Sequence, residues 1–381
     1  MGSSSRKRKP KGSKKVRVAF RRNRSKPPRI TNWTTQANQA EDAGAETKHT
    51  ERIVAKGDLS RHRTVIVPDD QEAAWKGLSR GTVVAMHGLY ADVDDGQCIR
   101  SCTVRRILRT QLIEERHPVT VGDHVRFRIQ RAGRKTTNEG VIQAVEPRSG
   151  QLRRRSGRRI QTIVANVDQA IIVASVQEPT LKPNLIDRYI VSALVGDITP
   201  IICINKVDLD ADGVGTALLE RYRTLGYTAI PTSAMAGIGI DTLTAVLKDK
   251  ASVIAGQSGV GKSSLLNAVQ PGLNLKTKDV MQRTHKGRHT TTTSSLIRLN
   301  VGGYVVDTPG IRSFDLTIIP REEFEAYFVE FVDRLRDCKF PDCTHTHEVE
   351  CAIKAAVEDG EINPERYRSY VQMFQDPGVM A

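Results

Sequence analysis

Residues 256–263 constrain the fold of this chain more than any other part of its sequence. They read Gly-Gln-Ser-Gly-Val-Gly-Lys-Ser and lie between the apolar run ASVIA and the helix-forming run SLLNAV. In that context the pattern predicts a turn between a buried strand and a helix, where backbone N–H groups and the helix N-terminus bind phosphate. The residues expected to contact the nucleotide here are Gly256, Gln257, Ser258, Gly259, Val260, Gly261, Lys262, Ser263 and Ser264. Lys262 is expected to reach the β- and γ-phosphates, and Ser263 to bind Mg²⁺.

A second pattern indicates which base the nucleotide carries. Asn205-Lys206-x-Asp208 ends the apolar run TPIICI. A carboxylate at this position can accept hydrogen bonds from N1–H and the 2-amino group of guanine, whereas adenine would leave it unpaired. Ser233 and Ala234 end the next strand-like run and are expected to contact the base. These motifs predict that the nucleotide is GTP.

A third pattern predicts the metal and the γ-phosphate contacts. Asp307-Thr308-Pro309-Gly310 follows the run GYVV. Asp307 is expected to hold Mg²⁺ through water, and the Gly310 N–H to contact the γ-phosphate. The run GRHTTTT lies between this motif and the phosphate loop, and Thr291 or Thr292 is expected to complete the Mg²⁺ shell. By itself, that run could equally be a polar loop.

The position that orients the attacking water in many GTPases is altered. Those proteins carry glutamine after Asp-x-x-Gly, and this chain has Ile311. An aliphatic side chain cannot orient water, so slow hydrolysis is expected in the absence of a partner. His289 is the candidate replacement, and a purely structural role for it remains open.

The order of these motifs predicts a circular permutation. The base motif comes first, then Ser-Ala, the phosphate loop, the threonine segment and Asp-x-x-Gly. Strand-like and helix-like runs alternate from Ile160 onwards, which predicts a doubly wound parallel sheet. The termini of such domains lie close together, so the chain can be cut and rejoined without changing the sheet. The switch segments then lead into the C-terminal region, which we hypothesise responds to the γ-phosphate.

Four residues near the C-terminus form a candidate metal site: Cys338, Cys343, His345 and Cys351. Three thiolates and one imidazole make a closed tetrahedral set for one structural Zn²⁺, with no position left for a catalytic water. His347 is a rival nitrogen ligand. Cysteines without a metal in a helical region are the alternative.

Charge and periodicity describe the N-terminal half. Of the net charge of +15, the first 30 residues supply 13 Lys or Arg and no acid. Such an arm is expected to be disordered and suits a polyanion such as RNA. A solvated tail and a targeting signal remain alternatives.

From about residue 77 to 147, short alternating runs broken by Gly and Asp predict a small barrel like an OB-fold. The basic stretch 148–159 is interpreted as a linker, and its five arginines in seven positions from Arg153 could equally contact RNA.

The fold class predicted is a multidomain α/β protein. The predicted domains are a basic extension at 1–60, an OB-like RNA-binding barrel at 61–158, a circularly permuted P-loop GTPase domain at 159–318 and a helical zinc-binding module at 319–381. No run of 18 apolar residues occurs, so no membrane contact is expected. The six cysteines fit a reducing compartment, and a cytoplasmic monomer is expected.

The order of parts resembles the ribosome small-subunit-dependent GTPase family (RsgA). Residues 77–375 carry the resemblance, most specifically in GQSGVGKSSLLN, GRHTTT, DTPGIRSF, CKFPDCTH and CAIKAAVEDGEI. The resemblance implies GTP and zinc at the residues named above, and the small ribosomal subunit and its rRNA as partners in late assembly, with hydrolysis stimulated by the subunit and linked to release. Family members commonly have Pro-Gly before the last cysteine, where this chain has Val349-Glu350.

Three other functions fit parts of the pattern. A permuted GTPase of the large subunit would share the GTP motifs, although a zinc module placed after the switches argues against it. A GTP-gated RNA-binding module with incidental hydrolysis is compatible with Ile311. An ATPase or kinase would require the Asn-Lys-x-Asp pattern to be a coincidence.

Overall fold

The computed structural model describes residues 13–19, 62–68, 75–104, 119–132, 135–156, 159–273, 294–307, 319 and 321–376. The chain divides into two compact units. One unit spans 1–77 and 106–118, and in it strand β1 (Ser13–Ala19) pairs antiparallel with β2 (His62–Pro68). β1 therefore lies inside the extension that was predicted to lack structure. Among the described residues, no helix is long and apolar enough to cross a bilayer.

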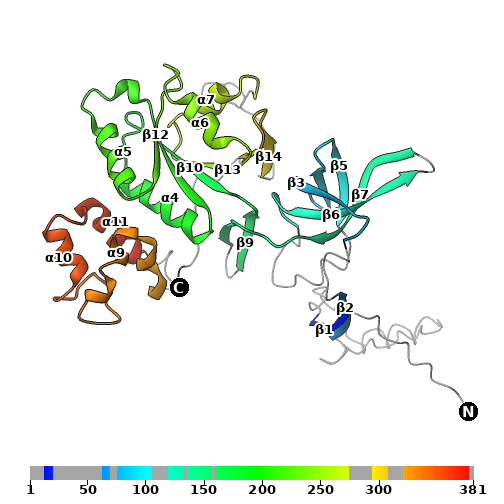
Figure 1. The fold of residues 1–381 in the computed structure, drawn as a ribbon, viewed down its shortest axis with the longest axis horizontal. Coiled ribbons are helices and arrows are strands. Elements are labelled where there is room, and N and C mark those ends of the chain that lie inside the picture. The colour runs from blue at the N-terminus through cyan, green and yellow to red at the C-terminus, as the bar shows by residue number, and fades with distance from the viewer. Residues whose placement is uncertain are drawn as a thin grey trace, which may run out of the picture. The chain divides into compact units, whose positions relative to one another are not determined.

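The second unit begins with a closed five-stranded barrel, as the alternating runs predict (Figure 1). Its strands are β3 (Ser79–His87), β4 (Tyr90–Asp94), β5 (Ile99–Val104), β6 (His124–Ala132) and β7 (Lys135–Val145). β3 pairs with both β4 and β6, and this double pairing closes the barrel. Apolar side chains at alternating positions fill the interior, with Val83, Val93 and Phe127 fully buried.

Part of the basic stretch 148–159 forms one strand of a β-hairpin. β8 (Leu152–Ser156) pairs antiparallel with β9 (Arg159–Val164). The backbone then runs beside a barrel loop, where the Ala165 N–H donates to the Val121 carbonyl at 2.9 Å. The Asn166 side chain donates to the Gly122 carbonyl and accepts from the Ser149 N–H, both at 2.9 Å. The predicted boundary at 158/159 thus falls at the first residue of β9.

A six-stranded α/β sheet follows. Its strands, in spatial order, are β12 (Thr228–Pro231), β11 (Thr199–Asn205), β10 (Gln169–Ser175), β13 (Ala251–Ala255), β15 (Tyr304–Asp307) and β14 (Ser295–Arg298). All neighbours pair in parallel except β14 and β15, which form an antiparallel hairpin. The motif-bearing ends of β11, β12, β13 and β15 therefore lie at one edge of the sheet.

Helices cover both faces of this sheet, as a doubly wound fold requires. The helical elements are α4 (Pro183–Val195), the 3-10 helix η2 (Val207–Leu209), α5 (Val214–Thr224), α6 (Ile240–Leu247) and α7 (Lys262–Val269). Alternate residues of β10 enter different cores, because successive side chains of a strand point to opposite faces. Ile172 packs in the core that contains α4 and α5, whereas Ile171 packs in the core that contains α6 and α7.

The C-terminal region is a separate small core built from short helices. They are the 3-10 helix η3 (Arg321–Tyr327), α9 (Val329–Val332), the 3-10 helix η4 (Leu335–Asp337), α10 (Ala352–Glu358) and α11 (Pro364–Phe374). Aromatic rings pack in this core: Phe328 and Tyr370 contact each other and both Phe324 and Phe331, with centroids 5.0–5.8 Å apart. Val191 of α4 belongs to the same core, so the region packs on the α/β sheet through α4.

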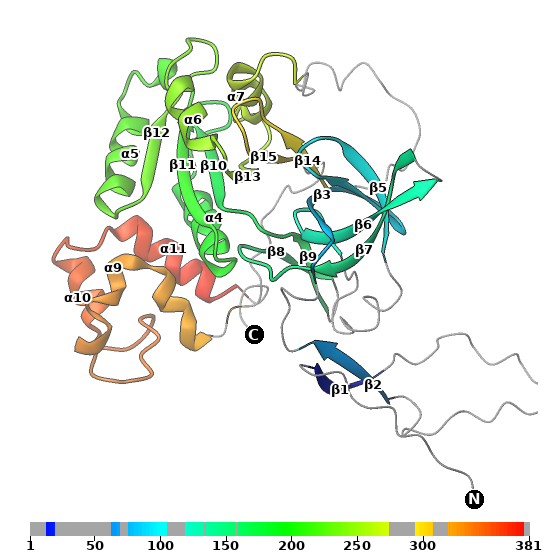
Figure 2. The same ribbon diagram turned by 45° about the vertical axis from the view of Figure 1, so that its right-hand side comes forward.

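The barrel also joins the β14–β15 hairpin. Ser295 of β14 pairs with Ala85 of β3, so one continuous sheet runs from the barrel into the α/β sheet (Figure 2). The Tyr304 hydroxyl donates to the Asp94 carboxylate at 2.9 Å, and Arg298 lies 3.5 Å from the same oxygen. The Asp94 carboxylate is buried at 7% side-chain exposure, whereas the Arg298 side chain is 60% exposed.

Candidate functional site

The predicted phosphate loop joins the last residue of β13 to the first residue of α7. Gly256, Gly259 and Gly261 have positive φ angles of 140°, 93° and 94°. A Cβ atom on Gly256 would lie 2.1 Å from the Val173 carbonyl oxygen, and one on Gly261 would lie 2.3 Å from the Asn205 side-chain nitrogen. Glycine is therefore required by the backbone conformation and by the close approach of the neighbouring strand ends.

Lys262 turns its ammonium group back over the loop. Its Nζ donates to the carbonyl oxygens of Gly256 and Gln257 at 2.8 and 2.7 Å. Burial lowers the pKa of Lys262, because desolvation disfavours a charge whose recorded partners are neutral carbonyls. A bound phosphate would supply the missing negative charge, so the residues present fit a nucleoside polyphosphate. Ser263 and Ser264 follow in the first turn of α7, and both are partly buried.

Asn205 connects three of the predicted motifs. It is the last residue of β11 and is 2% exposed. Its Nδ2 donates to the carbonyl of Val260 in the phosphate loop at 2.8 Å. Its Oδ1 accepts from the Ala234 N–H at 3.4 Å. The base motif, the phosphate loop and the Ser-Ala segment, which are far apart in the sequence, therefore meet at this side chain.

The other residues predicted to contact the base differ in exposure and in their partners. Lys206 has a φ of 63°, and its Nζ donates to the carbonyl of Glu178 at 2.5 Å. Asp208 lies in η2 with an exposed side chain, and among the described residues no hydrogen bond to its carboxylate is recorded. Ser233 is 1% exposed and shapes its own turn, since its hydroxyl accepts from the Ala236 N–H at 3.0 Å. Ser258 is exposed in the phosphate loop.

The predicted catalytic residues are only partly within the described chain. Asp307 is the last residue of β15, which runs parallel to β13. Its backbone therefore lies at the same edge of the sheet as the phosphate loop. His289, Thr291, Thr292 and Gly310 lie outside the described residues, and so does Ile311.

Changing Gly261 to alanine is expected to weaken guanine-nucleotide binding by at least about tenfold and to destabilise the domain by about 1–3 kcal/mol. The added methyl group would displace either the loop or the Asn205–Val260 hydrogen bond. Nucleotide affinity and the thermal midpoint measure both effects. Gly213→Ala is the matched control, because Gly213 has a φ of 69° but no atom within 4 Å of its Cβ position. Equal nucleotide affinity in the two variants would contradict the expected clash.

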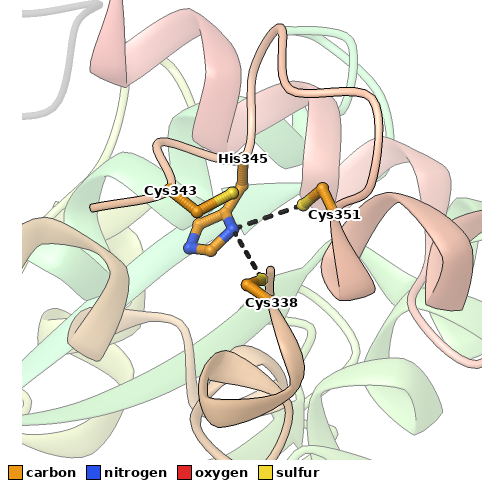
Figure 3. A group of neighbouring side chains, drawn as sticks. All are labelled: Cys338, Cys343, His345 and Cys351. Carbon is orange, nitrogen blue, oxygen red and sulfur yellow. Dashed lines mark hydrogen bonds between the residues drawn. The ribbon is translucent and has the colours of Figure 1, made fainter. Parts of the chain in front are cut away.

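The four residues of the predicted metal site come together in the C-terminal region (Figure 3). Their ligand atoms all lie within 4.8 Å of one another. His345 Nδ1 is 3.5 Å from Cys338 Sγ and 3.4 Å from Cys351 Sγ. Cys343, His345 and Cys351 are at most 6% exposed. His347, the rival ligand, is outside the cluster and its side chain is 81% exposed.

This donor set fits Zn²⁺. Bonds of about 2.3 Å to sulfur and 2.0 Å to nitrogen place the donors of a tetrahedral ion roughly 3.5–3.8 Å apart, close to the spacing here. Burial raises the pKa of the Cys343 thiol to about 12, and the neighbouring Cys351 adds to this. A divalent cation would reverse that effect by pairing with the thiolates. Four protein donors leave no open position, so such an ion would be structural.

Glu348, which was not among the predicted site residues, organises the metal-site loop. Its carboxylate accepts from the Thr344 N–H and hydroxyl at 2.8 and 2.7 Å, and from the Thr346 N–H at 3.0 Å. Burial would raise the pKa of Glu348, but these hydrogen bonds outweigh it and lower the pKa to about 2. In the sequence, the clue to this role is an acidic residue three positions after His345. A carboxylate at that distance can accept hydrogen bonds from backbone N–H groups of the same loop.

A buried charge network was also not predicted. Arg366 of α11 is 1% exposed and donates to Asp187 of α4 at 2.6 Å and to Glu330 of α9 at 2.7 and 3.0 Å. The Tyr222 hydroxyl of α5 donates to Asp187 at 2.8 Å. The network therefore ties the C-terminal region to two helices of the α/β sheet. The residues of this network lie far apart in the sequence, so no local sequence pattern predicts it.

The sheet and the site together define a class of protein. The phosphate loop follows the central strand β13, the base motif follows β11 two strands away, and the base motif precedes the loop in the chain. This is the arrangement of a circularly permuted P-loop GTPase. The chain belongs to the RsgA GTPase family, and it is a GTP-hydrolysing enzyme.

Sequence and structure comparisons support this assignment. Residues 145–317 match the family model described as RsgA GTPase. A curated protein of Shewanella oneidensis, named small ribosomal subunit biogenesis GTPase RsgA, is 40% identical over 311 residues, which cover 80% of this chain and 85% of the relative. A protein of the same name from Thermotoga maritima is 41% identical over 303 residues, covering 78% and 96%.

Two solved structures have the same fold. The crystal structure of YjeQ from Thermotoga maritima has a TM-score of 0.64 and 39% identity, and the match covers 78% of this chain and 97% of that one. The structure of YloQ, described as a circularly permuted GTPase, has a TM-score of 0.60 and 33% identity, covering 78% and 94%. The predicted fold class and permutation are thereby confirmed.

Proposed function

We propose that this GTPase acts in small ribosomal subunit biogenesis, binding the subunit through its rRNA as a late assembly factor. The observation that carries the proposal is the match to relatives named for that role over about four fifths of this chain. Hydrolysis is proposed to be stimulated by the subunit and linked to release. We further infer that the protein works as a cytoplasmic monomer, and its six cysteines, all free, are compatible with a reducing compartment.

The proposed site holds GTP between the phosphate loop and the base motif. Asp208 accepts hydrogen bonds from guanine, Ala234 contacts the base through its backbone, and Lys262 binds the β- and γ-phosphates. The proposed Mg²⁺ contacts are Ser263, Asp307 through water, and Thr291 or Thr292. That ion would neutralise charge developing on the phosphate oxygens. His289 is proposed to orient the attacking water, and the Gly310 N–H to contact the γ-phosphate.

The junction between barrel and hairpin supports control of hydrolysis by the subunit. The β14–β15 hairpin follows the threonine segment in the chain and ends at Asp307, so each of its ends adjoins a segment proposed to contact Mg²⁺ or the γ-phosphate. Tyr304 and Arg298 of that hairpin contact Asp94 of the barrel. An RNA that binds the barrel would therefore act on strands that end at the catalytic groups. The C-terminal region follows the Asp307–Gly310 segment in the chain, so binding of the subunit to that region could also act on the nucleotide site.

The charge distribution supports an RNA partner, chiefly through the basic arm. Many barrel arginines are already paired: Arg80 and Arg126 share Glu146, and Arg100 contacts Asp95. Arg128 of β6 is exposed. The first 30 residues, with 13 Lys or Arg and no acid, are therefore the stronger candidate for contacts to phosphates.

GTP turnover is expected to rise at least about tenfold when small subunits are added and to stay near its basal rate with large subunits. Unaided hydrolysis should be slow because Ile311 cannot orient water. The assay compares protein alone, with small subunits and with large subunits at fixed salt, because phosphate contacts are salt-dependent. Lys262→Ala, which lacks the proposed phosphate contact, controls for contaminating activity. Stimulation by neither subunit would favour the GTP-gated RNA-binding module, and stimulation by large subunits alone would overturn the assigned partner.

A further inference from the structure

We infer that Glu325 is the residue that positions the histidine ligand of the proposed zinc site. Its carboxylate oxygen Oε2 lies 2.9 Å from His345 Nε2. Glu325 belongs to η3 and is 20 positions from His345 in the sequence. Neither the cysteine spacing nor the motif around His345 includes it.

The chemistry of imidazole defines what Glu325 does. Nδ1 faces the cysteine sulfurs, so this nitrogen must offer its lone pair to the metal. The proton of a neutral imidazole then lies on Nε2, which needs an acceptor because the ring is 2% exposed. Among the described residues, the recorded acceptor is Glu325. The carboxylate therefore selects the tautomer, holds the ring orientation and makes Nδ1 a better donor.

The surroundings limit how the ring could adjust if Glu325 were removed. The Phe331 ring packs edge-on against His345, with centroids 6.0 Å apart at 78°. The Tyr367 hydroxyl donates to the backbone carbonyl of His345 at 2.7 Å, and that of Tyr370 donates to the carbonyl of Thr344 at 3.0 Å. The backbone and one face of the ring are thus fixed independently. Glu325 restricts the rotation of the imidazole ring that these contacts leave possible.

The inference rests on the proposed zinc site and is tested by metal binding in the full-length protein. Glu325→Ala is expected to weaken Zn²⁺ affinity about 10- to 100-fold, as measured by competition with a chromophoric chelator. It is also expected to alter the ligand-field spectrum of the Co²⁺-substituted protein, because the imidazole loses its orientation. Glu325→Gln keeps an acceptor oxygen without the charge, and should fall between Glu325→Ala and the wild type.

Glu323→Ala is the matched control, since Glu323 is an exposed acid on the same short helix. Its Zn²⁺ affinity and Co²⁺ spectrum should equal those of the wild type. If Glu325→Ala matches Glu323→Ala in both measurements, the inference is overturned, even if its thermal stability is lower. Wild-type protein that binds no stoichiometric Zn²⁺ would instead overturn the zinc site itself. A metal site that is intact but indifferent to Glu325 would leave the zinc proposal standing and remove only this inference.

Discussion

Replacing Arg366 with alanine is expected to lower the stability of the C-terminal region by about 3–5 kcal/mol. The guanidinium lies between two buried carboxylates, Asp187 at 1% and Glu330 at 8% side-chain exposure. Burial alone would lower the pKa of Arg366, but the nearby carboxylates outweigh it and raise the pKa, so the charge persists at neutral pH. Removing it leaves two carboxylates without their cation in a region that water hardly reaches.

The expected loss of stability exceeds the contribution of any one of the hydrogen bonds that Arg366 donates. In the described structure, Asp187 Oδ2 already lacks a hydrogen-bond partner. Arg366 also covers the Phe328 ring, with its Cζ 4.9 Å from the ring centroid, so truncation removes packing as well as charge. Urea unfolding monitored by circular dichroism, together with limited proteolysis of the C-terminal region, measures the effect.

Arg368→Ala provides the comparison, because Arg368 is on the same helix, is 69% exposed and lies 4.0 Å from Glu365. Its expected change is within about 0.5 kcal/mol. The triple variant Asp187→Asn, Glu330→Gln and Arg366→Met should recover much of the loss, since the desolvated charges are then removed together. A small effect of Arg366→Ala, comparable to that of Arg368→Ala, would show that the network does not stabilise the docked region.

Local patterns predicted the parts of this molecule whose chemistry depends on local spacing. Residues 256–263 form a strand–turn–helix because only glycine tolerates the φ angles and contacts at Gly256 and Gly261. The cysteine cluster was predictable for the same reason, since its members lie within 14 consecutive residues. The two-sided burial of β10 follows from its unbroken apolar run, which is typical of a parallel strand between helices.

Contacts between distant segments could not be read in this way. Asp187 and Arg366 are 179 positions apart, and an arginine that will be buried looks the same in a sequence as one that stays in water. The Asp94–Tyr304 contact is equally remote, at 210 positions. Residues 148–159 were interpreted as a linker or an RNA contact because arginines interrupted by glycine and serine suggested a solvated segment, and the pairing of β8 with β9 was not predicted. Backbone pairing with a neighbouring strand overrides that local preference.

Changing Asp208 to asparagine is expected to transfer nucleotide preference from GTP to xanthosine triphosphate. The carboxylate would accept two hydrogen bonds from guanine, and charge-assisted bonds of this kind contribute about 1.5–3 kcal/mol each. Asparagine keeps one acceptor oxygen but sets its own N–H donors against a donor of guanine, and losing one such bond corresponds to at least roughly 10- to 150-fold in affinity for GTP. Asparagine can instead donate to the extra carbonyl of xanthine, which restores a matched pair. Competition binding with the two triphosphates measures the ratio.

The position of Asp208 makes this change selective for the base. Its side chain is exposed and has no recorded hydrogen bond among the described residues, so the variant should fold as well as the wild type. Asn205, by contrast, is buried and holds the phosphate loop, so changing it would confound folding with recognition. Asp212→Asn makes the same chemical change at an exposed position four residues away and should leave the ratio unaltered. An unchanged preference in Asp208→Asn would mean that the base is recognised elsewhere, and the assignment of residues 205–208 as the guanine reader would be wrong.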